Sequence, residues 1–128
     1  MAHEVHKRIE EASAEFASLA ETNERLGKLS DRTAELLRQT GVIRMLQPTD
    51  FGGYAAEPRE FAEAVMAIAA ADPAAGWVAG VVGVHPWERA QMDRRLQEEI
   101  WGEDPDTWVA SPYMPNGVAD PIDGDNFV

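Results

Sequence analysis

The feature that most constrains the fold is a run of small apolar residues, AVMAIAAADPAAGWVAGVVGVHPW, at positions 64–87. Asp72 and Pro73 divide this run, because an Asp-Pro pair ends one helix and begins another. The run is too interrupted for a membrane span and favours two buried helices. Gly76, Ala79, Gly80 and Gly83 leave little side chain on one face, so another backbone can approach closely. Gly80 and Gly83 lower helix propensity by about 1 kcal/mol each relative to alanine, so close packing must offset them. Pro86 is expected to close or kink the second helix.

Three further helices are predicted around this pair. Val5, Ile9, Ala12, Phe16 and Leu19 recur at helical spacing, which predicts an amphipathic helix to about Leu26. Ser30 is placed to cap a second helix that Gly41 ends, with Leu36 and Leu37 facing inward. Pro58 fits the first turn of the first helix of the buried pair. Residues 88–100 are expected to form the last helix, with Met92, Leu96 and Ile100 as its inward stripe. The chain is therefore expected to be mainly α.

The residues after the last predicted helix have a different character. The segment WVASPYMP, at positions 108–115, has strand-like composition, and turn residues dominate from there to Val128. We therefore expect two units, a helical domain over residues 1–106 and the beginning of a β domain over residues 107–128.

Composition excludes several classes of function. The 128 residues contain no cysteine, so disulfides, thiolate metal sites and a cysteine nucleophile are excluded. A net charge of −12 disfavours nucleic acid and anionic membranes as partners. Nothing in the sequence indicates export, and the expected location is the cytoplasm.

Two stretches carry candidate chemistry. Trp77, Val81 and His85 follow one another at four-residue spacing, so they could form one wall of an apolar pocket with the imidazole as its polar group. The alternative is a core helix whose histidine bonds a backbone carbonyl. In the stretch Ser111 to Pro115, a serine hydroxyl and extended backbone could bind a ligand. His3 and His6 lie one turn apart, but no third metal ligand is in view, so no metal site is predicted.

These stretches also carry a resemblance. Pro48 to Gly53 matches a P-x-x-[FYW]-G-G turn of the acyl-CoA dehydrogenase fold. GWVAGVVGVHPW, QEEIWGEDPDT and ASPYMP resemble the oxygenase components of two-component flavin-dependent aromatic monooxygenases, among them hydroxylases of phenolic secosteroids in steroid degradation and of 4-hydroxyphenylacetate. The resemblance covers roughly residues 26 to 124. It implies the N-terminal helical domain of that fold, followed by the start of its central β domain.

The resemblance also implies an activity and its site. Members of this family are homotetramers of about three times this length that hydroxylate a phenol ortho to its hydroxyl group. They use O₂ and reduced FMN or FAD, which a separate reductase supplies as diffusible flavin. By position, Trp77 and His85 match residues that line the substrate and flavin pocket, and Ser111 and Tyr113 fall in the first β-domain strand beside the flavin ring. We therefore expect His85 to be catalytic and to bind the substrate together with Trp77 and Val81, and we expect Ser111, Tyr113 and Met114 to bind the flavin.

The sequence departs from the family near its end, where Asp125 to Val128 stand in place of a second glycine and an aromatic residue. We therefore expect this chain to correspond to the first third of an oxygenase, to bind flavin weakly and to be inactive alone. Two alternatives stay open. One is an acyl-CoA dehydrogenase, although SPYMPNGVADP differs from that family's Thr-Glu-Pro and Gly-Ser-Asp pattern. The other is a non-catalytic helical fragment or assembly partner.

Overall fold

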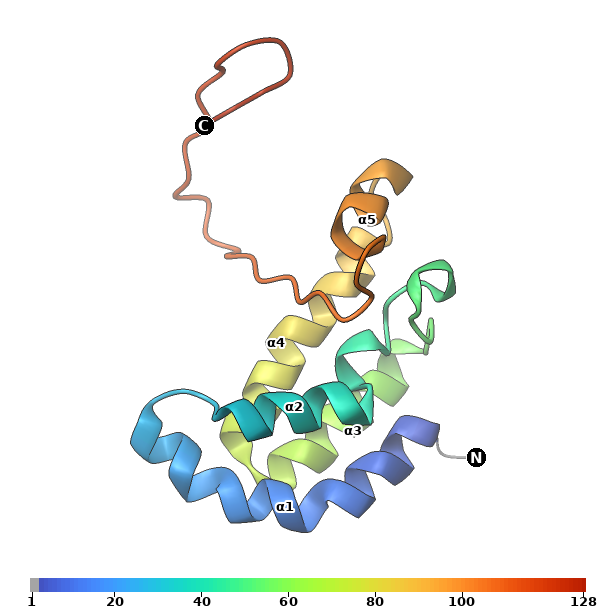
Figure 1. The fold of residues 1–128 in the computed structure, drawn as a ribbon, viewed down its shortest axis with the longest axis vertical. Coiled ribbons are helices and arrows are strands. Elements are labelled where there is room, and N and C mark those ends of the chain that lie inside the picture. The colour runs from blue at the N-terminus through green and yellow to red at the C-terminus, as the bar shows by residue number, and fades with distance from the viewer. Residues whose placement is uncertain (1–2) are drawn as a thin grey trace.

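The computed structural model describes residues 3–128, and helices make up most of this range (Figure 1). The elements are α1 (Glu4–Leu26), α2 (Asp31–Thr40), the 3₁₀ turns η1 (Val42–Arg44) and η2 (Thr49–Phe51), α3 (Pro58–Ala71), α4 (Pro73–Arg89) and α5 (Arg94–Trp101). Within the same range no strand forms, and one antiparallel bridge joins Pro121 to Phe127. The prediction of a mainly α chain is confirmed.

The first two helices follow the local signals of the sequence. The side chains of Val5, Ile9 and Phe16 are buried, as the helical spacing predicts. The Ser30 hydroxyl accepts a hydrogen bond from the second helix's first turn, and Gly41 ends that helix with a left-handed φ of 81°. Capping side chains and left-handed glycines satisfy backbone groups that a helix end leaves unpaired, which explains why these boundaries were predictable.

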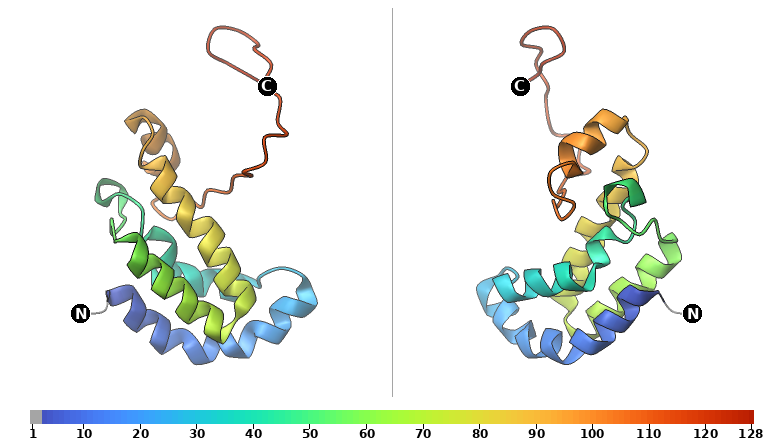
Figure 2. Two further views of the ribbon diagram at one scale, coloured as in Figure 1. Left: turned by 180° about the vertical axis from the view of Figure 1, so that it is seen from behind. Right: turned by 45° about the vertical axis from the view of Figure 1, so that its right-hand side comes forward.

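Helices α3 and α4 form an antiparallel hairpin around the Asp72-Pro73 junction (Figure 2). Pro58 occupies the first turn of α3, and Pro73 occupies that of α4. At Gly76 the two backbones approach so closely that an added Cβ would lie 2.5 Å from the Cβ of Ala69. The small residues of α4 therefore permit the close packing that their composition predicted.

The core lies where the other elements meet this hairpin. Seen from behind, α1 runs beneath the α3–α4 pair and α2 crosses its far side (Figure 2). The buried apolar side chains come from every one of these elements and from η1: Val5, Ile9, Phe16, Leu36, Leu37, Val42, Ile43, Met45, Leu46, Phe61, Ala64, Ile68, Ala75 and Ala79. Among residues 3–128, no helix is both long and apolar enough to cross a bilayer.

Two predictions about the end of the helical region are wrong. Of the two outcomes expected for Pro86, closure of α4 is wrong, because the helix continues to Arg89 and the backbone N–H of Ala90 still donates to the oxygen of Pro86, whereas a kink at Pro86 stays a prediction. The last helix starts at Arg94 rather than at residue 88, because the Asp93 side chain caps it by accepting from the backbone N–H of Arg95.

The predicted inward stripe of that last helix is also wrong. Met92 precedes the helix and is exposed, and Leu96 is 37% exposed. The later start places different residues inward, and α5 instead buries Gln97 and Trp101. The Trp101 ring lies 6.0 Å from that of Phe51, so α5 packs against the η2 turn rather than against the main core.

After α5 the chain runs back along the helices and then leaves them as an extended tail (Figure 1). Trp108 is half-buried, and the Arg38 guanidinium lies 4.2 Å from its ring centre. Residues 108–115, expected to be strand-like, pair with no neighbour in the described range, so their extended backbone forms no ladder. The division into a helical domain and a β domain beginning at residue 107 stays a prediction.

Candidate functional site

Helix α4 carries the candidate site, and its start is firmly anchored. The Asp72 carboxylate is buried, accepts the backbone N–H of Ala74 at 2.9 Å and accepts the Asn23 amide of α1 at 2.7 Å. Asn23 also bonds Thr33 of α2. This buried network joins three helices at one end of α4, which fixes the direction in which its side chains project.

An apolar groove of about 370 Å³ runs along the outer side of the α3–α4 hairpin. Trp77 and Val81 form its α4 side together with Gly76 and Gly80, and Val65 and Ala69 face them from α3. The Trp77 side chain is 75% exposed. Because the neighbouring glycines present no side chain, the groove offers one flat apolar wall that is open to solvent.

His85 lies one turn beyond Val81 in a different environment. Its side chain is 0% exposed, and its Nδ1 atom is 3.3 Å from Glu88 Oε2 and 3.4 Å from the Tyr113 hydroxyl oxygen. The Tyr113 hydroxyl donates to Glu88 Oε1 at 2.5 Å. His85 Nε2 is buried and has no hydrogen-bond partner within residues 3–128. The alternative that His85 bonds a backbone carbonyl is therefore wrong for this structure.

The contact between Tyr113 and Glu88 sets the protonation of both. The hydrogen bond from Tyr113, with a further one from His85, holds the pKa of Glu88 below its usual range. The same bond to a carboxylate, together with burial, raises the pKa of Tyr113 above its usual value of 10.0. At neutral pH Glu88 is therefore an anion and Tyr113 is a neutral hydroxyl donor.

The structure does not bring all three predicted wall residues into one pocket. Trp77 and Val81 share the groove, whereas His85 is absent from its lining and faces Tyr113 instead. Eight residues on a helix of about 100° per residue leave an offset of roughly 80°, which is enough to turn His85 away from Trp77. The expectation of a continuous Trp77–Val81–His85 wall is corrected accordingly.

The predicted flavin-facing residues lie in the tail. Tyr113 reaches back to α4, and its ring centre lies 5.5 Å from that of His85. Ser111 is half-buried and Met114 is 70% exposed. Sequence reasoning missed Glu88, although its position three residues after His85 on a helix was an available signal.

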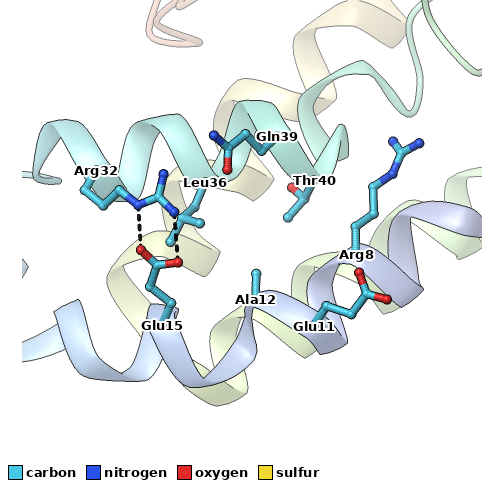
Figure 3. A pocket seen from close by; sticks show the side chains of 8 residues that line it. All are labelled: Arg8, Glu11, Ala12, Glu15, Arg32, Leu36, Gln39 and Thr40. Atoms are coloured by element: carbon cyan, nitrogen blue, oxygen red, sulfur yellow. Dashed lines mark hydrogen bonds and ion pairs between the residues drawn. The ribbon is translucent and has the colours of Figure 1, made fainter.

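A second cleft, of about 290 Å³, lies between α1 and α2 and is polar (Figure 3). Its arginines are already engaged: Arg32 binds the Glu15 carboxylate through two nitrogens, and Arg8 bonds Glu4 and the Tyr54 hydroxyl. Figure 3 shows the Arg8 guanidinium turned away from the Arg32–Glu15 pair. Because both cations have protein partners, this cleft is a weaker candidate for binding an anionic ligand.

The histidines near the N-terminus have structural contacts. His3 Nδ1 accepts the backbone N–H of Val5 at 3.2 Å and so caps α1. His6 Nε2 lies 3.0 Å from the backbone oxygen of Glu60. No cluster of metal-ligating side chains occurs in the described part of the chain.

Comparison with known proteins identifies relatives along nearly the whole chain. A pigment production hydroxylase of Rhodococcus erythropolis is 51% identical over 124 residues, which are 97% of this chain and 32% of the hydroxylase. The oxygenase subunit HsaA of a flavin-dependent monooxygenase of Mycobacterium tuberculosis is 39% identical over 120 residues, which are 94% of this chain and 30% of HsaA. No family model matches the chain.

The fold agrees with these relatives. The crystal structure of 3-HSA hydroxylase from Rhodococcus sp. RHA1 superposes with a TM-score of 0.93 at 36% identity, covering 98% of this chain and 32% of the hydroxylase. The expected helical domain of the acyl-CoA dehydrogenase fold is thereby confirmed. The chain spans about a third of the length of the relatives it matches.

Proposed function

We propose that this chain, which is homologous to the oxygenase components of flavin-dependent monooxygenases, supplies one side of the pocket in which such an enzyme hydroxylates a phenol. The observation that carries the proposal is the similarity in sequence and fold along almost the whole chain. The relatives named above are hydroxylases or monooxygenases, which favours this function over that of an acyl-CoA dehydrogenase.

In this proposal the groove of α3 and α4 contacts the aromatic ring of the substrate. Trp77 and Val81 offer the apolar surface that a planar ring requires, and the open side of the groove leaves room for the remaining walls. His85 lies outside the lining of this groove, so its proposed role is to orient the phenol hydroxyl from one turn beyond Val81 through Nε2, the ring nitrogen that has no partner within residues 3–128. Their role is to bind, orient and exclude water, which is the protein's usual share in cofactor chemistry.

The tail supplies the flavin side. The Tyr113 hydroxyl beside His85 gives a polar contact, and the neighbouring Ser111 and Met114 give a small donor and an apolar surface, so these residues fit one edge of a flavin ring. Bound reduced flavin would supply the two electrons with which O₂ yields one oxygen for the phenol and one for water. We include in the proposal a cytoplasmic homotetramer that receives reduced FMN or FAD from a separate reductase.

A first experiment asks whether the chain binds flavin by itself. Reduced FMN and reduced FAD are titrated anaerobically into the purified chain while tryptophan fluorescence is recorded. Because the described residues cover one side of a ring only, we expect binding weaker than millimolar. Tight one-to-one binding would contradict this expectation and would show that these residues form a complete flavin site.

A chimera tests the proposed activity. The matching third of the Rhodococcus erythropolis hydroxylase, 51% identical, is replaced by this chain, and phenol hydroxylation is compared with hydrogen peroxide release. We expect Trp77→Ala to raise the KM for the phenol and to divert flavin oxidation to peroxide. Met66→Ala is the control, because Met66 is similarly exposed on α3 but lies outside the groove. A folded but inactive chimera, or a Trp77→Ala chimera with unchanged KM and coupling, would refute the proposal.

A further inference from the structure

The Glu88 side chain forms hydrogen bonds with both His85 and Tyr113. Glu88 lies three residues after His85 on α4, and each of its carboxylate oxygens contacts a different partner. Oε2 lies beside His85 Nδ1, and Oε1 accepts a hydrogen bond from the Tyr113 hydroxyl. Tyr113 is 28 residues from His85 along the chain. The cluster therefore joins the tail to the buried end of α4 through one carboxylate.

The protons of this cluster can be assigned from its hydrogen bonds. A phenol hydroxyl has one proton, and the 2.5 Å contact to Glu88 uses it. The Tyr113 oxygen can then offer His85 only a lone pair, and ionised Glu88 is an acceptor with no proton to give. Both neighbours of Nδ1 are therefore acceptors, so Nδ1 must carry a hydrogen to bond either of them.

We propose that Glu88 is a positioning residue that holds neutral His85 in the Nδ1–H tautomer, with Tyr113 directing its own proton to the same carboxylate. A neutral imidazole has a single N–H, so Nε2 then bears a lone pair. The imidazolium form is disfavoured by geometry, because Nε2 is buried without a partner within residues 3–128 and a proton there would be an unsatisfied buried donor. A carboxylate that fixes a histidine tautomer through one nitrogen sets the chemistry available at the other.

The chemical class of ligand follows from that lone pair. Nε2 can accept a hydrogen bond from a neutral hydroxyl group and would repel a phenolate oxygen. This step rests on the function proposed above. It specifies that the substrate binds beside His85 as the neutral phenol, which still carries its hydroxyl proton, and not as the phenolate. The tautomer itself depends only on the contacts of Glu88 and Tyr113.

The test is a long-range ¹H–¹⁵N NMR spectrum of the chain labelled with ¹⁵N-histidine, in which protonated and unprotonated ring nitrogens are distinguished directly. The chain has three histidines, and His85→Phe identifies the signals of His85 by their loss. At pH 7 we expect a protonated Nδ1 and an unprotonated Nε2. A spectrum with Nε2 protonated, alone or together with Nδ1, would overturn the proposal without any substitution.

Substitutions distinguish the role of Glu88 in setting the His85 tautomer from that of Tyr113. Glu88→Ala leaves the Tyr113 hydroxyl free to donate to Nδ1, so we expect the tautomer to switch to Nε2–H, whereas Tyr113→Phe leaves Glu88 in place and the Nδ1–H form unchanged. Glu99→Ala, at an exposed glutamate on α5, is the control. An unchanged tautomer in Glu88→Ala would overturn the role of Glu88, and Glu88→Asp, which keeps the carboxylate, is expected to restore the wild-type spectrum.

Phenol and anisole test whether Nε2 accepts a hydrogen bond from a ligand hydroxyl, because anisole carries a methyl group in place of the hydroxyl proton of phenol. Because the isolated chain forms one side of the pocket only, both ligands are added to the chimera described above, labelled with ¹⁵N-histidine, in which we expect phenol to shift the Nε2 resonance of His85 and anisole to leave it unchanged. An Nδ1–H tautomer that responds to neither would uphold the positioning role of Glu88 and refute the proposed function at His85.

Discussion

The close approach of α3 and α4 gives a stability prediction with an internal control on the same helix. A Cβ at Gly76 would lie 2.5 Å from Ala69 Cβ, 2.6 Å from Ala69 Cα and 2.9 Å from its backbone nitrogen. Backbone atoms cannot rotate away, so the helices must separate. At Gly80, by contrast, the nearest atom to an added Cβ is Val65 Cγ1 at 3.5 Å, an ordinary van der Waals contact.

The expected magnitudes follow from two opposing terms. Replacing a helical glycine by alanine stabilises by about 1 kcal/mol through helix propensity. Overpacking costs about 1–3 kcal/mol and tends to the upper end where backbone must move. Gly76→Ala should therefore lower the free energy of unfolding by about 1–2 kcal/mol, whereas Gly80→Ala should raise it by about 0.5–1 kcal/mol.

Urea unfolding followed by circular dichroism measures both variants, and thermal unfolding gives an independent check. At about 4 °C per kcal/mol, the two midpoints should differ by roughly 6–12 °C, with the wild type between them. Equal shifts of the same sign in Gly76→Ala and Gly80→Ala would refute the claim that α4 approaches α3 closely at Gly76 and loosely at Gly80.

Two further predictions concern polar contacts. Asn23→Ala removes the amide that donates to Oδ2 of the buried Asp72 carboxylate, whose Oδ1 keeps the backbone N–H of Ala74, so urea unfolding should show a loss of about 1–3 kcal/mol. A loss below about 0.5 kcal/mol would contradict the buried network. The raised pKa of Tyr113 makes its contact with Glu88 complete below pH 10.0, its usual value, and lost as the pH rises through the folded value. The lowered pKa of Glu88 makes the same contact complete above 4.5 and lost as the pH falls through the folded value. Absorbance at 295 nm should show Tyr113 ionising above pH 10.0, and Glu88→Gln should bring this midpoint down; a Tyr113 midpoint at or below 10.0 would contradict the contact.

Helix boundaries set by a local device could be predicted from sequence. Ser30, Gly41, Pro58 and Asp72 act within one turn of the residue they cap, so their effect can be read from neighbouring positions. The start of the last helix was predicted wrongly, although its cap is local too. Asp93 is also a local cap, but the continuous charged pattern from residue 88 concealed it.

The site was less predictable because its decisive contacts are distant in sequence. The hydrogen bond of Tyr113 to Glu88 spans 25 residues, and no periodicity relates the two positions. Two steps of four residues turn the helix by about 80° beyond two full turns, so His85 and Trp77 project in different directions although their spacing places them roughly on one face. Sequence patterns thus proposed His85 and Tyr113 as candidates but missed Glu88, and the path of the tail determined which of these side chains meet.

The packing of α4 also explains why an exposed tryptophan is tolerated there. Consecutive helical residues project about 100° apart, so fixing Gly76 against Ala69 turns Trp77 away from the α3 contact and toward solvent. Neighbouring Gly80 leaves the indole with an apolar groove beside it rather than a cover. The two glycines therefore have two effects. Gly76 allows α4 to pack closely against α3, and Gly80 leaves the face of the Trp77 ring uncovered beside the groove. A larger residue at either glycine would change the shape of the groove as well as the stability, because the same face of α4 carries both the helix contact and the groove.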